Sequence, residues 1–264
     1  MSQSTSDDRV SALKCRFEDQ RGIWSPAWES VAKLNPGYLE GYLKIQWASQ
    51  HRNRLPPKIQ ELCYIAVASS VTHMYLPAVE AHILAALRTG ATSEEIFEVL
   101  GLSYLLGVHT VTMGFPILQE LVEELSIPAD TVTPEQQELK EIIKSRFIAT
   151  RGFWPETFKP LLDLDPEFFE QYTDFSSFSP RSKVLEPKYR ELIITAIDAA
   201  TTHLYSRGTK IHMRNALKMG ITPAEVLEML EITSLMGIDG VVNSAPLLAK
   251  ARELVPKDGS SLST

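Results

Sequence analysis

Cysteine is scarce in this sequence of 264 residues, which has only Cys15 and Cys63. They lie far apart and form no Cys-x-x-Cys pair. The chain therefore offers neither a disulfide framework nor a zinc site built from thiolates. This scarcity favours a reducing compartment.

The sequence also lacks basic clusters and long apolar runs. Its formal net charge is −7, which argues against nucleic acid or an anionic membrane as a partner and favours small molecules or proteins. The longest fully apolar run, residues 62–68, is far shorter than the roughly 20 residues that a membrane span needs. The first residues carry neither a basic segment nor an apolar core of a secretory signal. We therefore expect a cytoplasmic protein that does not span a membrane.

An internal repeat is the most informative feature that the sequence does have. Adding 130 to a residue number in the first half reaches a matching residue many times, without a gap. The matching pairs include Arg21/Arg151, Gly22/Gly152, Trp24/Trp154, Thr72/Thr202, His73/His203, Tyr75/Tyr205, His82/His212 and Gly90/Gly220. Two copies of this length exclude a solenoid and favour a dimer-like arrangement within one chain. We expect the repeats to be residues 1–130 and 131–264, joined within residues 127–134.

Both repeats are predicted to be helical. Apolar residues recur at helical spacing, and no segment alternates convincingly with a period of two. Gly90 is suited to end one helix, while Thr92 and Glu95 are spaced as a capping box that opens the next. The second repeat carries the same signals. The expected fold is all-α, with two tandem homologous helical lobes, one per repeat, related by a pseudo-twofold axis.

The candidate catalytic residues belong to a segment that occurs in both repeats, Thr-His-x-Tyr followed by a second histidine. They are His73, Tyr75 and His82 in the first repeat and His203, Tyr205 and His212 in the second. A histidine on an apolar helix is often only a core residue, but histidine is suited to proton transfer near neutral pH and tyrosine adds a donor. Pro77 and Gly208 are expected to break or bend a helix, so that the two histidines can converge on one cleft.

The two repeats differ between their histidines. The second repeat offers Arg207 and Lys210, which are suited to bind a substrate carboxylate, although a solvated helix face is an equal alternative. The first repeat has Glu80 at the position of Lys210. We therefore expect the chemistry in the second repeat, with His212 as general acid and base and with His203 and Tyr205 orienting the substrate.

A longer pattern surrounds the second histidine. It consists of Arg190, Glu191, Leu192, His212, Ala216, Leu217, Gly220, Thr222, Glu225, Val226 and Glu228, and the first repeat carries the same string from Glu61 through Glu98. This pattern resembles the carboxymuconolactone decarboxylase and AhpD-like superfamily. The resemblance implies an all-helical fold that assembles into oligomers, so we expect a homo-oligomer, a trimer or a dimer.

The resemblance covers two kinds of chemistry. AhpD-like members are thiol peroxidases or reductases that use a Cys-x-x-Cys pair before the histidine, but Tyr205 and Gly208 occupy those positions here, as do Tyr75 and Ala78 in the first repeat. Disulfide exchange requires a thiolate, so this activity is disfavoured. The decarboxylases act on a lactone acid without a cofactor. The resemblance therefore implies a cofactor-independent carboxy-lyase or isomerase acting on a small carboxylated or enolisable molecule.

Other interpretations of the sequence stay open. A glutamate commonly precedes the histidine by four residues in the decarboxylases, and Ala78 and Gly208 in its place leave the substrate undetermined. The protein could also be a non-catalytic oligomeric scaffold or ligand-binding protein of the same fold. A third alternative is a metal-dependent enzyme, whose ligands would be His203, His212 and Asp239, the counterpart of His109.

Two further features of the sequence favour structural roles. The counterpart of Cys63 is Ile193, which points to core packing. The duplicated Arg-Gly-x-Trp motif, at 21–24 and 151–154, is more typical of a tight corner with a buried tryptophan than of a substrate clamp.

Overall fold

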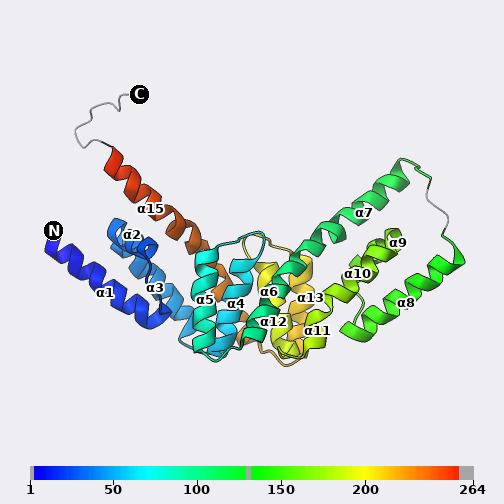
Figure 1. Ribbon diagram of the computed structural model, residues 1–264, viewed down its shortest axis with the longest axis horizontal. Coiled ribbons are helices and arrows are strands. Elements are labelled where there is room, and N and C mark those ends of the chain that lie inside the picture. Colours follow the sequence, from blue (N-terminus) through cyan, green and yellow to red (C-terminus); the bar gives the residue numbers. More distant parts are fainter. Residues whose placement is uncertain (1–2, 129–131, 256–264) are drawn as a thin grey trace.

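The computed structural model describes residues 3–128 and 132–255, and this part of the chain contains helices and no strands (Figure 1). The first repeat forms α1 (Gln3–Arg21), α2 (Pro26–Leu34), α3 (Pro36–Gln50), α4 (Pro57–Ser69), α5 (Leu76–Arg88), α6 (Ser93–Tyr104), η1 (Leu105–Gly107) and α7 (Val108–Glu124). The second forms α8 (Pro134–Arg151), η2 (Glu156–Phe158), α9 (Lys159–Leu164), α10 (Pro166–Ser176), α11 (Phe178–Ser182), α12 (Pro187–Ala199), α13 (Ser206–Lys218), α14 (Pro223–Ser234), η3 (Leu235–Gly237) and α15 (Ile238–Leu254). The expected all-α fold is thus confirmed. The expected join at 127–134 includes residues 129–131, which lie outside the described residues.

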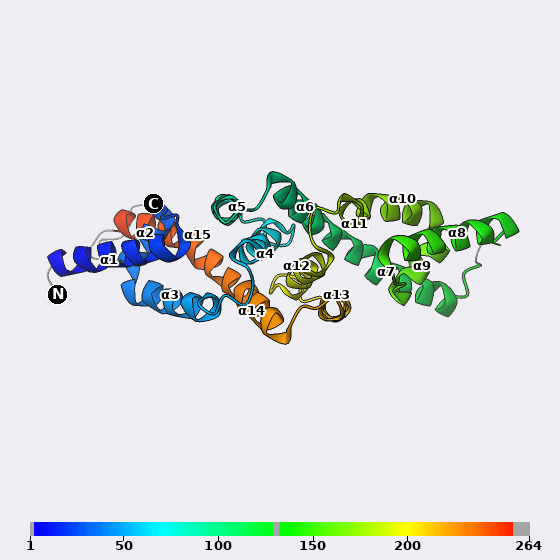
Figure 2. The same cartoon turned by 90° about the horizontal axis from the view of Figure 1, so that it is seen from below.

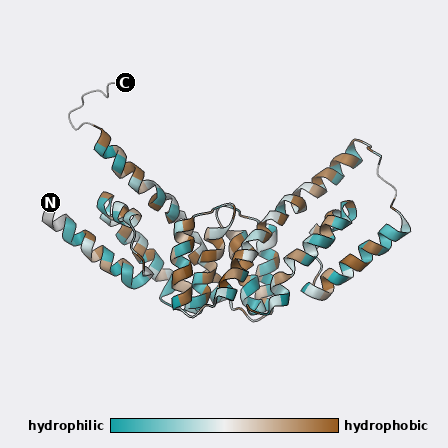
Figure 3. Ribbon diagram, viewed as in Figure 1, coloured by the Kyte–Doolittle hydropathy of each residue, from teal (hydrophilic) through white to brown (hydrophobic). Residues whose placement is uncertain are grey.

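The main core lies in the central block, where α4 packs against its counterpart α12. Leu62 and Ile65 of α4 and Leu192 and Ile193 of α12 have no exposed surface. Apolar residues gather in these central helices in Figure 3. Because each repeat buries the apolar face of the other, the two repeats form one hydrophobic core.

The helix that ends each repeat extends out to the opposite end of the molecule. α15, from the second repeat, packs on α2 of the first, and α7, from the first repeat, packs on α9 of the second. Figures 1 and 2 show these helices beside α1–α3 and α8–α10, respectively. Each end of the molecule therefore combines helices from both repeats, which a division of the chain at residue 130 does not describe.

Buried glutamates tie the two repeats together. Glu228 of α14 has no exposed surface and accepts hydrogen bonds from the backbone N–H of Arg54 and from Gln60 Nε2, both at 2.8 Å. Its counterpart Glu98 of α6 accepts from Arg190 Nε at 3.4 Å. A buried carboxylate is costly unless hydrogen-bonded, so both matched glutamates serve the packing between repeats.

The helix boundaries follow the sequence signals. Thr92 and Glu95 form a complete capping box at the start of α6, and the same box opens α14. Gly90, which follows α5, has a φ of +90°, a left-handed conformation that favours glycine. These local predictions are confirmed.

Two continuous helical stretches, residues 93–124 and 223–254, are long and apolar enough to be candidate membrane spans. The sequence expectation considered only uninterrupted apolar runs and did not anticipate them. Of the most apolar window in each stretch, 44% and 39% is buried within the protein. Only length and composition make a helix a candidate membrane span, and helices buried in a protein core can have both properties.

Candidate active sites

The Thr-His-x-Tyr segment forms the turn that precedes α5 in the first repeat and α13 in the second. Met74 and Leu204 adopt positive φ values of 52° and 51° at the centre of these turns. The next residue returns toward the preceding helix: the N–H of Tyr205 donates to the carbonyl of Asp198 at 2.8 Å, and that of Tyr75 donates to the carbonyl of Ala68 at 3.0 Å. The first histidine of each pair therefore lies on a tight turn and not within a helix.

Neither Pro77 nor Gly208 bends a helix, contrary to the sequence expectation. α5 begins at Leu76 and α13 at Ser206, so both residues lie in a first helical turn. Proline is accommodated there because the first N–H groups of a helix have no partner within it. The turn itself, and not a kink, separates the two histidines.

The second histidine of each pair forms a hydrogen bond with a glutamate of the preceding helix. His212 Nδ1 lies 2.8 Å from Glu191 Oε2, and His82 Nδ1 lies 2.6 Å from Glu61 Oε2. Asn215 Nδ2 also donates to Glu191, at 3.0 Å. A carboxylate at Nδ1 orients the imidazole and directs proton exchange to Nε2. Both glutamates belong to the repeated pattern, but no role was predicted for them from the sequence. Their recurrence together with a duplicated histidine was the available signal.

The first histidine of each pair contacts the last helix of the other repeat; we call these two helices, α7 and α15, the exchanged helices. His203 Nε2 lies 2.6 Å from His109 Nδ1 of α7, and His73 Nε2 lies 2.8 Å from Asp239 Oδ2 of α15. The set His203, His212 and Asp239 is therefore not brought together, because α15 carries Asp239 to the opposite end. We call the group around His73, His82, Tyr75, Glu61 and Asp239 the first site, and the group around His203, His212, Tyr205, Glu191 and His109 the second site.

The second site opens into a cavity of about 700 Å³, measured with its open mouth. His212, Tyr205 and His109 line it together with Arg151, the arginine of the Arg-Gly-x-Trp motif. Arg151 Nη2 donates to Ser176 Oγ at 2.5 Å, whereas its buried Nε has no hydrogen-bond partner among the described residues. Burial lowers the pKa of this guanidinium. A bound anion would supply the missing acceptor.

Arg207 and Lys210 are exposed on α13 and do not line this cavity. The carboxylate-binding role expected for them therefore does not fit their positions, because they lie on the solvent side of the helix. The cation that lines the second cavity is Arg151. Its motif also forms the predicted corner, since Gly152 ends α8 with a φ of +78° and Trp154 packs on Phe147.

An aspartate that sequence reasoning missed lies beside the second site. Asp198 of α12 is 1% exposed, and burial raises the pKa of its carboxyl to about 7. Burial, together with the neighbouring His203 and His212, lowers the pKa of His109 to about 4, and burial also lowers the pKa of His203. An acid within the apolar stretch Ile-Thr-Ala-Ile-Asp-Ala-Ala was the available signal.

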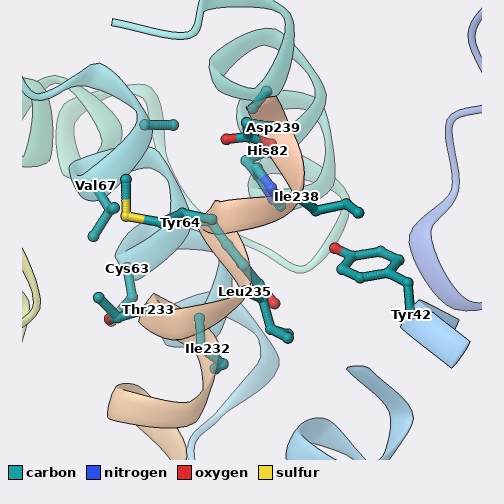
Figure 4. A pocket seen from close by; sticks show the side chains of 13 residues that line it. Tyr42, Cys63, Tyr64, Val67, His82, Ile232, Thr233, Leu235, Ile238 and Asp239 are labelled. Carbon is teal, nitrogen blue, oxygen red and sulfur yellow. The ribbon is translucent and has the colours of Figure 1, made fainter. Parts of the chain in front are cut away.

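The first site has more acidic surroundings. An open cavity of about 1300 Å³ is lined by three acidic residues and one cation, together with His82 and Tyr75; the charged residues are Glu61, Glu80, Asp239 and Arg88. Burial and the charge of Asp239 raise the pKa of the Tyr75 hydroxyl. In a smaller adjoining cavity, Figure 4 shows the side chains of His82 and Asp239 side by side. The two sites thus share a Glu–His pair but differ in the charge of their walls.

A model of the carboxymuconolactone decarboxylase family matches residues 36–108 and 166–251. The chain belongs to the carboxymuconolactone decarboxylase family. Its fold is also similar to a crystal structure from Burkholderia xenovorans, described as a proposed gamma-carboxymuconolactone decarboxylase subunit, with 40% sequence identity and a TM-score of 0.88. That alignment covers 93% of this chain and 98% of the other. A comparison with curated protein sequences gave no match.

Each matched region of this carboxymuconolactone decarboxylase family member contains one Glu–His pair. Neither cysteine lines the second cavity. Cys15 is exposed on α1, and Cys63 is buried beside the first site, where burial raises the pKa of its thiol to about 12. A thiol of that pKa is a poor nucleophile at neutral pH.

Proposed function

We propose that this protein is a cofactor-independent carboxy-lyase or isomerase that acts on a small carboxylated or enolisable molecule at the second site. The observation that carries the proposal is the Glu191–His212 pair beside a cavity that Arg151 also lines. A proton-transfer group and an anion-binding group thus share one cavity. Thiol peroxidase activity is not proposed, because Cys63 is buried and lies at the other site.

Each residue has one task in the proposed reaction. Arg151 binds a carboxylate of the substrate, and Glu191 holds His212 through Nδ1 so that Nε2 exchanges the proton. In a decarboxylation, the electron pair of the broken C–C bond enters the conjugated system of a β,γ-unsaturated acid as CO₂ leaves. His212 then delivers a proton to carbon. Tyr205, whose ring stacks on His109 at 3.9 Å, orients the substrate.

Gamma-carboxymuconolactone is the first substrate to test, since the B. xenovorans relative is described by that name. The protein of 264 residues is incubated with this lactone, and the release of CO₂ is followed together with the loss of substrate. We expect turnover that His212→Gln reduces by 10²-fold or more, the range of a general acid–base contribution. Folding of the variant is checked by thermal melting.

A set of enolisable carboxylic acids follows if the lactone is not consumed, because Gly208 stands where the decarboxylases commonly carry glutamate. Proton exchange at carbon, measured by deuterium incorporation from D₂O, reports isomerase or lyase chemistry without requiring a product. Absence of both turnover and exchange across the set would contradict an enzyme and favour the ligand-binding alternative. We further propose that the protein works as a cytoplasmic homo-oligomer.

A further inference from the structure

Three potential metal ligands from three different segments meet at the second site. They are His109 at the start of α7, Asp198 near the end of α12 and His203 in the turn that follows. One nitrogen or oxygen atom from each lies within 4.8 Å of the others. His109 Nδ1 is 2.6 Å from His203 Nε2, so these two nitrogens would face the same ion.

We propose that His109, Asp198 and His203 bind one divalent transition-metal ion per chain. Two imidazoles and one carboxylate suit Zn²⁺, Fe²⁺, Co²⁺ or Mn²⁺, and three protein ligands leave further coordination positions open. At metal–nitrogen bonds of about 2.1 Å, two ligand nitrogens lie about 3.0–3.4 Å apart. The two imidazole nitrogens need to separate by roughly half an ångström to admit an ion, a shift within the range of side-chain motion.

The state of Asp198 supports an ion. Its Oδ2 is buried and has no hydrogen-bond partner among the described residues. A buried carboxylate oxygen without a partner costs free energy, and a cation removes that cost.

The first site provides an internal comparison. His73 corresponds to His203 and Asp239 to His109, but the position of Asp198 is taken by Ala68. The first site thus has potential ligands at two of the three positions, His73 and Asp239, and none at the third. The chain also differs at residue 208, where glycine leaves the space that the Asp198 carboxylate occupies, whereas the first repeat has Ala78. The differences at 198 and 208 go together: the second repeat has a buried carboxylate at 198 and the space for it at 208, and the first repeat has alanine at both positions.

The ion would lie in the cavity wall beside Tyr205 and His212, which line the same cavity as His109 and Asp198. The inference does not depend on the proposed reaction, since binding is measured without turnover. A protein that binds the ion and lacks lyase activity would contradict the proposed function alone. A lyase that binds no ion would contradict this inference alone.

The test uses the protein of 264 residues, first stripped of metal with a chelator and dialysed into metal-free buffer. Zn²⁺ and Co²⁺ are titrated separately, with stoichiometry from elemental analysis after desalting and ligation followed by the visible absorption of Co²⁺. The variants are Asp198→Asn and His203→Gln, each close in size to the original residue. Asp239→Asn, at the first site, is the matched control. Thermal melting shows that each variant is folded.

We expect one ion per chain in the wild-type protein and in Asp239→Asn, with affinity reduced at least a hundredfold in Asp198→Asn and His203→Gln. Absence of binding by the wild-type protein at micromolar metal would overturn the inference. Binding that survives both second-site variants would do the same. An ion lost in Asp239→Asn would place the metal at the first site and equally overturn the proposal.

Discussion

The carboxylate of Asp198 occupies the space in which a side chain on Gly208 would begin. A Cβ on Gly208 would lie inside van der Waals contact of Asp198 Oδ2 and 2.6 Å from Tyr205 Cδ1. The corresponding residues of the first repeat are Ala68 and Ala78, a pair with no carboxylate to accommodate. The two positions have therefore changed together between the repeats.

This relationship predicts a strong coupling between the two positions. Gly208→Ala alone overpacks the site and is expected to lower the free energy of unfolding by about 1–3 kcal/mol. Combined with Asp198→Ala, which recreates the alanine pair of the first repeat, the same change is expected to cost at least about 1 kcal/mol less. Urea unfolding of the wild type, both single variants and the double variant measures the coupling. Strictly additive effects would show that the two side chains do not compete for space.

Asp198 also predicts how stability varies with pH. Because the pKa of its carboxyl is raised to about 7 from 3.8, the folded state holds an extra proton between these values. The contribution of this group is therefore complete below about pH 4 and is lost as pH rises through 7. Asp198→Asn removes that loss. The free energy of unfolding of the variant, relative to wild type, is expected to rise by on the order of 2–3 kcal/mol between pH 5 and 7.5.

Denaturation at several pH values, with chelator present to exclude metal, measures this difference. The opposite contribution of His109, whose lowered pKa costs stability as pH falls through 6.5 toward 4, is common to both proteins. A difference that stays constant with pH would mean that the carboxyl of Asp198 titrates near its ordinary value.

Arg151 is predicted to be the residue that holds an anionic substrate. Arg151→Met keeps most of the side-chain volume and removes the charge, and kcat/KM is expected to fall by about 10–100-fold, mainly through KM. Lys210→Met is the control, because Lys210 is exposed outside the cavity, and its kcat/KM is expected to change by less than about twofold. Steady-state kinetics on whichever of the proposed test compounds is consumed compares the two variants. A larger effect from Lys210→Met would restore the role first expected for that residue.

The two sites are predicted to be unequal in activity. At the second site an anionic substrate meets Arg151 and one carboxyl group, that of Asp198. The first cavity is lined by three acidic residues and one cation, which are Glu61, Glu80, Asp239 and Arg88. At a few ångströms and an effective dielectric constant near 20, each extra carboxylate near the substrate is unfavourable by on the order of a few kcal/mol, so the first site disfavours an anion. His212→Ala is therefore expected to remove most of the activity and His82→Ala little of it. Equal losses, or a larger loss from His82→Ala, would assign the chemistry to the first site.

The protein is predicted to form a homo-oligomer, a trimer or a dimer. The exchanged helices expose apolar side chains along their length, among them Leu118 and Leu121 of α7 and Leu247 and Leu254 of α15. Such rows are costly in water and are typical of interfaces. Light scattering at micromolar concentration is expected to give a multiple of 29.6 kDa. A mass near 29.6 kDa would show that one chain is the complete assembly.

The helices and the repeat could be predicted from the sequence because their signals are local. The capping box of Thr92 and Glu95 and the turn at Gly90 depend on a few neighbouring residues. The paired histidines were found for a similar reason, since the repeat preserves their spacing. Even there the local geometry was misjudged, because Pro77 in a first helical turn bends nothing.

The composition of the sites could not be predicted in the same way. His109 meets His203 and Asp239 meets His73 only because α7 and α15 cross to opposite ends, and nothing in the spacing of these residues encodes that crossing. Arg151 was noticed as part of a structural corner. That the motif also directs a guanidinium into the cavity depends on how α8 packs, which is a tertiary property.

Because α7 and α15 each pack on the other repeat, joining two copies in one chain changes how substitutions in these helices affect the two sites. In a symmetric pair of single-repeat chains, one substitution in the last helix would appear in both sites at once. Once two copies are joined, residue 109 affects one site and residue 239 the other, so each can change alone. The histidine at 109 and the aspartate at 239 are such a divergence. One chain can therefore contain two sites with different residues, although each site needs a residue from both repeats.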